Sequence, residues 1–160
     1  MSVTVRPARA SDAGFIARNN VAMALEAEHK VLDPSIAAAG VANALADDSK
    51  GRYFVAERDG AAVGQLMITY EWSDWRNGTF WWIQSVYVLP EARRSGVFRT
   101  LFEYLAQAAR RDPSVCGIRL YVDHDNERAQ ATYRGCGLTD AGYRVMEIDY
   151  SGAVRAPDGG

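Results

Sequence analysis

The segment best suited to chemistry is a short basic loop that leads from an apolar strand into a helix. It contains Arg93, Arg94, Ser95 and Gly96, and the helical periodicity begins at Val97. The first N–H groups of a helix lack internal partners and carry partial positive charge, so they favour anions. Gly96 permits close backbone approach because it has no Cβ. The loop is therefore a candidate phosphate-binding site. A solvated basic helix start explains the same residues equally well.

A second pattern lies about thirty residues further along the chain. Asn126, Ala129 and Tyr133 recur at intervals of three and four residues, which places them on one face of a helix. Gly137 is suited to end that helix in a left-handed conformation. Asn126 is also a favoured N-cap residue, which is the structural alternative to a binding role.

In this order, the two patterns resemble those of the GNAT superfamily of acyl-CoA-dependent N-acetyltransferases. The family's Gln/Arg-x-x-Gly-x-Gly/Ala is matched by residues 93–98, and its Asn-x-x-Ala-x-x-x-Tyr and Gly-Phe/Leu are matched by Asn126, Ala129, Tyr133, Gly137 and Leu138. The resemblance extends from the first strand to about Tyr150. Phe98 departs from the pattern, because the family usually has Gly or Ala there. A phenyl ring at this position would narrow the pyrophosphate site or turn into the core.

The resemblance implies acetyl-CoA as co-substrate and direct attack of an amine on the thioester, without an acyl-enzyme. Backbone groups along Val86, Tyr87 and Val88 would hold the pantetheine arm and the acetyl carbonyl, like an added strand. The pyrophosphate would lie on the N–H groups that follow Arg93, with Asn126 beside the pantetheine. The residues implied for the pyrophosphate loop are Arg93, Arg94, Ser95, Gly96, Val97, Phe98 and Arg99. On this basis Cys116 and Cys136 are structural rather than nucleophilic.

Tyr133 is implied to lie near the sulfur, where it is the predicted general acid. A thiol has a pKa near ~8.5 and a phenol near ~10, so a tyrosine can donate or share a proton as the thiolate departs. A tyrosine packed in the core is the alternative.

The acceptor amine must lose a proton before attack, since an alkyl ammonium has a pKa near ~10.4. The family often places an acidic base, at times acting through water, in two regions. Here Glu71 ends a strand, and Glu26 and Glu28 end the first helix. We predict Glu71 as the base and Glu26 as a substrate-binding residue, although each glutamate is also compatible with a solvated surface charge.

Aromatic residues are unusually dense between positions 70 and 82. Strand alternation puts Trp81 and Trp82 on opposite faces of the sheet, so one of them is expected in the core. We predict that Trp72 and Trp75 wall an acceptor pocket, because aromatic faces beside carboxylates suit a cationic amine. Core packing explains this cluster equally well.

The predicted function is therefore an N-acetyltransferase that moves an acetyl group from acetyl-CoA to a primary amine of a small molecule. A protein lysine or N-terminal acetyltransferase would use the same cofactor site, so the motifs do not separate the two. A non-catalytic acyl-CoA-binding module is a third alternative, which the presence of Tyr133 disfavours. Homodimers are common in the family, so a homodimer is implied by analogy.

Composition indicates one domain without a nucleic-acid or membrane partner. The chain has 160 residues, is 48% hydrophobic and carries a net charge of −2. This near-neutral balance argues against a broad nucleic-acid surface. No apolar run reaches the ~18 residues of a membrane span, and the N-terminus lacks a secretory pattern. The two cysteines and two histidines lack metal-ligand spacing, which predicts no metal site and a cytoplasmic location.

The elements expected to position these motifs form an α+β (α/β/α layered) domain over residues 1–150, followed by a flexible C-terminal tail at 151–160. Asp59-Gly60 predicts a hairpin, and Asp33-Pro34 predicts a helix start. The resemblance implies a mixed, mostly antiparallel sheet of six to seven strands, splayed at the cofactor site and flanked by about four helices. Strands are predicted at 3–8, 53–57, 62–72, 80–88, 118–122 and 143–150, and helices from 12, over 34–46, over 96–111 and over 126–136.

Overall fold

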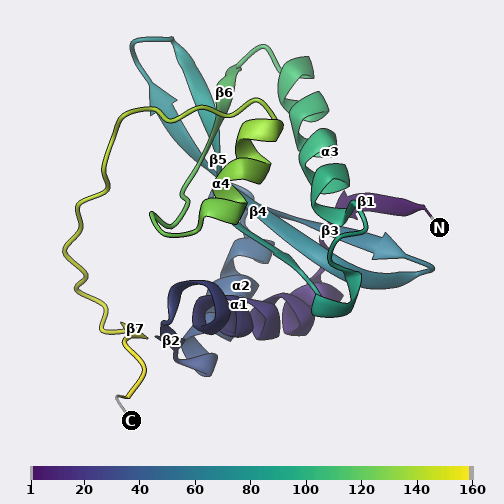
Figure 1. Ribbon diagram of the computed structural model, residues 1–160, viewed down its shortest axis with the longest axis vertical. Helices are drawn as coiled ribbons and strands as arrows, with labels where there is room; N and C mark the ends of the chain where they lie inside the picture. Colours follow the sequence, from purple (N-terminus) through teal and green to yellow (C-terminus); the bar gives the residue numbers. More distant parts are fainter. Residues whose placement is uncertain (1, 159–160) are drawn as a thin grey trace.

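The computed structural model describes residues 2–158 and shows a central sheet between two layers of helices (Figure 1). The elements are β1 (Val3–Pro7), α1 (Ala13–Glu28), β2 (Val31–Leu32), α2 (Pro34–Ala46), β3 (Arg52–Arg58), β4 (Ala61–Ser73), β5 (Gly78–Val88), α3 (Val97–Arg111), β6 (Val115–Leu120), α4 (Glu127–Gly135) and β7 (Val154–Arg155). The main sheet has the order β1-β3-β4-β5-β6, and only the β5–β6 pair is parallel. The predicted layered α+β fold is confirmed.

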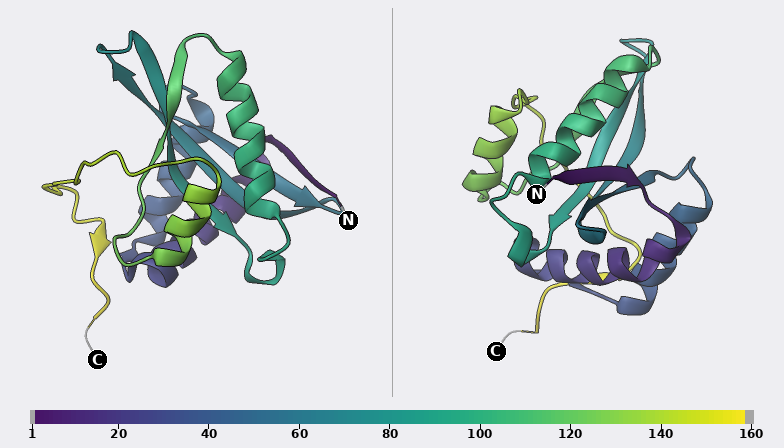
Figure 2. Two further views of the ribbon diagram at one scale, coloured as in Figure 1. Left: turned by 45° about the horizontal axis from the view of Figure 1, so that its top comes forward. Right: turned by 90° about the vertical axis from the view of Figure 1, so that its right-hand side faces the viewer.

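Helices α1 and α2 lie on one side of the sheet, and α3 lies on the other (Figure 2). On the α3 side, Leu101 and Leu105 pack with Leu66 and Ile68 in the larger apolar cluster. The smaller cluster, on the α1 and α2 side, contains Ile16, Val41, Ala44, Tyr53 and Val55. No helix within residues 2–158 is long and apolar enough to cross a membrane.

Ile36, Val41 and Leu45 recur at spacings that predict a buried stripe on the second helix, and this prediction is partly wrong. Val41 is buried and Leu45 is half-buried, whereas Ile36 is 52% exposed. At 3.6 residues per turn, Ile36 lies well off the line that joins Val41 to Ala44 and Leu45. Ala37 falls on that line instead and is half-buried.

Two turn and cap predictions are confirmed. The Asp33 carboxylate accepts hydrogen bonds from the N–H groups of Ser35 and Ile36, and α2 begins at Pro34. Asp59 and Gly60 have φ values of 54° and 78°, which is the pair of positive angles that a two-residue hairpin needs.

The predicted strand at 143–150 is wrong, because this segment pairs with no other strand in the described part of the chain. The main sheet consequently has five strands, not six or seven. A separate two-stranded sheet joins β2 to β7, with Val31 opposite Arg155 and Leu32 opposite Val154. Part of the predicted tail is thus paired, while residues 159–160 lie outside the described range. Local alternation identifies a strand-competent segment but does not supply its backbone partner.

Gln65 is the most buried polar residue of the sheet, with 0% exposure. Its Oε1 accepts from Asn19 Nδ2 at 2.9 Å, and its Nε2 donates to Asn20 Oδ1 at 2.9 Å. These bonds fix α1 on the sheet. A buried polar group that loses its partner costs about 1–3 kcal/mol. We therefore expect Gln65→Leu to lower the free energy of unfolding by about 2 kcal/mol in urea denaturation. The double variant with Asn19→Leu should recover part of that loss, and an unchanged free energy for Gln65→Leu would contradict the role of this network.

Candidate active site

The sheet opens where β5 continues beyond β6. The last residue pair between these strands is Ile83–Leu120, and residues 85–88 of β5 pair only with β4. The Leu89 N–H donates to the Val63 carbonyl at 2.9 Å. Since backbone direction alternates along a strand, the N–H and C=O groups of Val86 and Val88 face the open side. The predicted splay is therefore present, with an exposed backbone edge suited to an added strand-like ligand.

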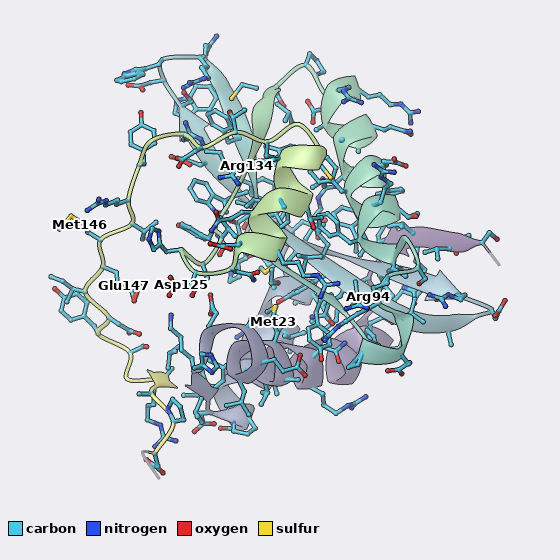
Figure 3. All side chains as sticks on the ribbon, viewed as in Figure 1. Met23, Arg94, Asp125, Arg134, Met146 and Glu147 are labelled. Carbon is cyan, nitrogen blue, oxygen red and sulfur yellow. The ribbon has the colours of Figure 1, made fainter. Side chains whose placement is uncertain are left out.

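The loop after β5 is held in an unusual conformation at the start of α3. Arg94 has φ 61° and Gly96, the N-cap, has φ 84°. A side chain in the left-handed region costs about 1–2 kcal/mol, so the arginine needs support from its surroundings. Ser95 provides it: its Oγ donates to the Ala92 carbonyl at 2.6 Å and accepts from Arg58 Nη2 at 2.6 Å. Figure 3 labels Arg94 on this loop, just before the start of α3.

The N–H groups of this loop have no protein acceptor. Within the described residues, none of those from Arg94 through Arg99 donates a hydrogen bond, and the next one, from Thr100, donates to the Gly96 carbonyl at 3.0 Å. A Cβ built on Gly96 would meet nothing within 4 Å, so the space beside the N-cap is open. Consecutive unpaired N–H groups at a helix start form an anion-binding concavity. This is the arrangement that a pyrophosphate requires.

Phe98 turns toward α4 instead of into the loop. Its ring lies 5.6 Å from the Tyr133 ring, centroid to centroid, and 6.2 Å from that of Phe102. Phe98, which departs from the family pattern, therefore packs against the ring of Tyr133. Burial, with a smaller effect of Cys136, raises the pKa of the Tyr133 phenol above its ordinary value. Tyr133 is therefore protonated at neutral pH, as a general acid must be.

The guanidinium of Arg93 contacts other groups than the N–H groups at the start of α3. Its Nε donates to the Val88 carbonyl at 3.0 Å, and its Nη2 lies 2.9 Å from Glu26 Oε2. The Tyr87 hydroxyl donates to the same carboxylate at 3.2 Å. Burial, followed by the charge of Glu26, raises the pKa of Tyr87. Glu26, at the end of α1, is thereby fixed beside the open edge of β5.

Glu71 lies elsewhere. On β4, Glu71 lies opposite Phe80, in the part of β5 that is paired with β6. Both carboxylate oxygens of Glu71 are 3.4 Å from Arg119 Nη1. The Arg119 guanidinium also stacks over the Phe80 ring at 3.9 Å. The structure therefore brings Glu26, and not Glu71, to the opening of the sheet.

The aromatic cluster divides as strand alternation predicts. Trp81 is in the core with 6% exposure, and Trp82 stacks on Tyr121 at 4.6 Å on the other face. Trp72 and Trp75 are 62% and 85% exposed near the β4–β5 turn. They are not brought to the open edge, so the predicted acceptor wall is not formed by these two residues in this structure.

Asn126 acts as a helix cap in the structure. Its Oδ1 accepts from the Ala129 N–H at 3.1 Å, which is the structural alternative that its residue type allowed.

Sequence reasoning missed Arg58 and Arg119 as neighbours of site residues. Both reach their partners across the sheet, 37 positions away from Ser95 and 48 from Glu71, and no local motif marks such pairs.

A cavity of about 290 Å³ follows the seam between α3 and α4. It shares Arg99 with the loop, and the other lining residues are Phe102, Glu103, Ala106, Gln107, Arg110, Gly135 and Cys136. Residues 2–158 contain no group of three or more His, Cys, Asp or Glu side chains placed to hold a metal ion.

Comparison with known proteins agrees with this geometry. Residues 22–138 match the acetyltransferase (GNAT) family model. A crystal structure of a possible acetyltransferase from Clostridium difficile 630 is 42% identical, with a TM-score of 0.86 over 93% of this chain and 98% of that one. None of the curated proteins searched matches the chain.

Two more distant structures share the fold. Ribosomal-protein-alanine N-acetyltransferase from Brucella melitensis biovar Abortus 2308 is 17% identical, with a TM-score of 0.73 over 93% of this chain and 100% of that one. An aminoglycoside N-acetyltransferase in complex with CoA is 14% identical, with a TM-score of 0.72 over 93% of this chain and 95% of that one.

Proposed function

The chain belongs to the acetyltransferase (GNAT) family, and on that premise we propose that it transfers an acetyl group from acetyl-CoA to a primary amine of a small molecule. The amine attacks the thioester directly, in a ternary complex. The observation that carries this proposal is the run of unpaired N–H groups from Arg94 through Arg99, which continues from the open backbone edge of β5.

The residues present fit acetyl-CoA. The N–H groups of the loop donate hydrogen bonds to the pyrophosphate oxygens, because they are unpaired and Gly96 leaves the space beside them free. The N–H and C=O groups of Val86 and the N–H group of Val88 pair with the amides of the pantetheine arm, while the Val88 carbonyl accepts from Arg93 Nε. Acetyl-CoA supplies the activated acetyl group, with the CoA thiolate as leaving group, and the protein orients the thioester against the acceptor.

Tyr133 donates a proton to the departing sulfur in this proposal. Its phenol is held by the Phe98 ring, and its raised pKa keeps the proton in place until negative charge develops. Glu26 is held beside the open edge by its contacts with Arg93 and Tyr87. We therefore assign to Glu26, in place of Glu71, the removal of the proton from the acceptor amine, directly or through water.

The proposal is tested by measuring free-thiol release from acetyl-CoA with a panel of amines. Two fold neighbours bear names for different acceptors, an aminoglycoside and a ribosomal-protein alanine, so the panel includes aminoglycosides, polyamines, amino acids and N-terminal peptides. We expect release that requires a small amine. Release with peptides alone would assign a protein acceptor, and no amine-dependent release from folded, CoA-binding protein would contradict catalysis.

Glutamine substitutions separate the two candidate carboxylates. Loss of a positioned general base lowers turnover about 100-fold, so we expect Glu26→Gln to reduce kcat by that order and Glu71→Gln to reduce it less than threefold. Steady-state rates with the best amine at saturating acetyl-CoA measure both. The reverse ranking would return the role to Glu71.

A further inference from the structure

A hollow of about 450 Å³ lies on the face of the sheet that α3 covers, where that helix ends. Three strands contribute Arg52, Tyr70 and Trp81 to its lining. The segment before β3 contributes Asp48, and the segment after α3 contributes Asp112. Trp81 belongs to the larger apolar cluster, and Tyr70 lies opposite it on β4, which places the hollow on the α3 face. Its volume is within the range of ~300–1,000 Å³ that small-molecule sites occupy.

The hollow is separate from the loop before α3. The helix has 15 residues, so its two ends lie about 20 Å apart. Gly96 caps the first end, and Asp112 follows the second. Figure 1 shows the second end at the top, where the β4–β5 hairpin also projects. A ligand in the hollow therefore does not contact the N–H groups proposed for the pyrophosphate.

Arg52 is the cation of this hollow, and its Nε is buried without a hydrogen-bond partner in the described part of the chain. The central carbon of its guanidinium lies 5.4 Å from the centroid of the Phe54 ring and 5.1 Å from that of Trp81. None of the ion pairs within residues 2–158 includes this guanidinium. A guanidinium is a planar fork that binds a carboxylate through two parallel hydrogen bonds. The two rings therefore hold Arg52 in place for a carboxylate that no described residue supplies.

Two carboxylates lie around this guanidinium. The hydroxyl and the N–H of Ser114 both donate to Asp112 Oδ1, at 2.6 Å and 2.9 Å, and these bonds lower the pKa of Asp112, so it is ionised at neutral pH. The Asp48 carbonyl accepts from the Tyr70 hydroxyl at 3.1 Å, which fixes the segment that carries the Asp48 carboxylate. The C-terminal end of a helix also carries partial negative charge. This side of the hollow therefore favours cations.

The charges of the lining specify the ligand. One guanidinium and two carboxylates give a net charge of −1. A basic amino acid has one carboxylate and two cationic groups, which is the opposite arrangement and the opposite net charge. A neutral amino acid would leave one carboxylate without a partner, and a diamine would leave Arg52 without an acceptor. The Tyr70 ring, 38% exposed, adds an aromatic surface that suits a cationic side chain.

We propose that this hollow binds a free basic amino acid, with its α-carboxylate on Arg52 and its two cationic groups on Asp48 and Asp112. Binding is reversible and involves no covalent step. The site lies apart from the acetyl-CoA loop, so the proposal does not depend on the acetyl transfer proposed above.

Calorimetric titration with three matched compounds tests the chemistry of the ligand. L-norleucine is L-lysine without the side-chain ammonium, and cadaverine is L-lysine without the carboxylate. We expect saturable binding of L-lysine, and binding at least about tenfold weaker for each of the other two, because each leaves one charged group of the hollow unpaired. Equal affinity for cadaverine or L-norleucine would overturn the proposal. So would the absence of saturable binding for L-lysine, L-arginine and L-ornithine.

Substitutions decide whether L-lysine binds in the hollow or at the open edge of β5. We expect Arg52→Gln, Asp112→Asn and Asp48→Asn each to weaken L-lysine binding at least about tenfold. Asp48 is exposed, so Asp48→Asn preserves the test if Arg52→Gln alters the fold. Glu26→Gln is the matched control, because it removes a carboxylate beside the open edge, and it should keep the affinity for L-lysine. Weaker binding in Glu26→Gln with unchanged binding in the other variants would contradict the assignment.

A ¹⁵N–¹H correlation titration with L-lysine locates the ligand directly. We expect the largest shifts at the Trp81 indole N–H and at the amides of Thr79 and Ser114, which line the hollow. The amides of Arg94 through Arg99 should stay in place. Saturable shifts that are confined to the loop before α3 or to residues 85–88, with the Trp81 indole unmoved, would overturn the proposal.

Discussion

Tyr133→Phe is expected to lower kcat about 100-fold while leaving CoA affinity nearly unchanged, because only the proton donor is removed. The phenylalanine keeps the ring that packs on Phe98 at 5.6 Å. Steady-state kinetics and calorimetric titration with CoA measure the two quantities. Tyr104→Phe is the control, since Tyr104 also stacks on a phenylalanine, Phe54, at 5.5 Å but lies about two turns along α3 from the loop.

The pH profile gives a second readout of the same residue. Burial raises the pKa of the Tyr133 phenol above its ordinary value, so its contribution is present below the pKa of the folded protein and is lost as the pH rises through that value. We expect a decline in kcat above pH 10 that is absent in Tyr133→Phe. An unchanged kcat in this variant would remove the general-acid role.

Gly96→Ala is expected to weaken CoA binding about tenfold. Gly96 has φ 84°, and a side chain in that region costs about 1–2 kcal/mol. The alanine at the N-cap avoids this cost when its backbone changes conformation, and the N–H groups at the start of α3 then turn away from the phosphate. CoA binding must restore the left-handed conformation, so the cost appears as weaker binding. The space beside Gly96 is open, so the effect comes from the backbone angle and not from a clash.

Gly40→Ala is the matched control for that substitution. Gly40 lies within α2, where an added Cβ also meets nothing within 4 Å and φ is not positive. Alanine in a helix interior is more favourable than glycine by about 0.5–1 kcal/mol, so this variant should gain stability and keep its CoA affinity. Equal CoA affinity in both variants would show that the left-handed N-cap is not required.

The positions of the loop and of the two late helices were predictable from local signals. Gly96 before an apolar helix and Asn126 before Ala129 mark helix starts, and the structure places α3 and α4 at Val97 and Glu127. Backbone groups bind the ligand in such a site, so the side chains need only set the turn geometry. A short pattern can therefore predict the position of such a loop.

The direction of long side chains was not predictable in the same way. Arg93 was expected on the phosphate loop but binds Glu26 and the Val88 carbonyl, because α1 brings a carboxylate from 67 positions away. Glu71 and Trp72 had suitable chemistry but lie on the closed part of the sheet. The segment 143–150 had suitable alternation, but it pairs with no strand within residues 2–158. In each case the deciding contact is long-range.

The most direct test of the account is a ¹⁵N–¹H correlation titration of the protein with CoA. We expect the largest shifts at the amides of Arg94 through Arg99 and of Val86 and Val88, with the amides of Trp72 and Trp75 nearly unmoved. Shifts concentrated elsewhere, or saturable binding that leaves the Arg94–Arg99 amides in place, would contradict the assignment of this loop as the acetyl-CoA site.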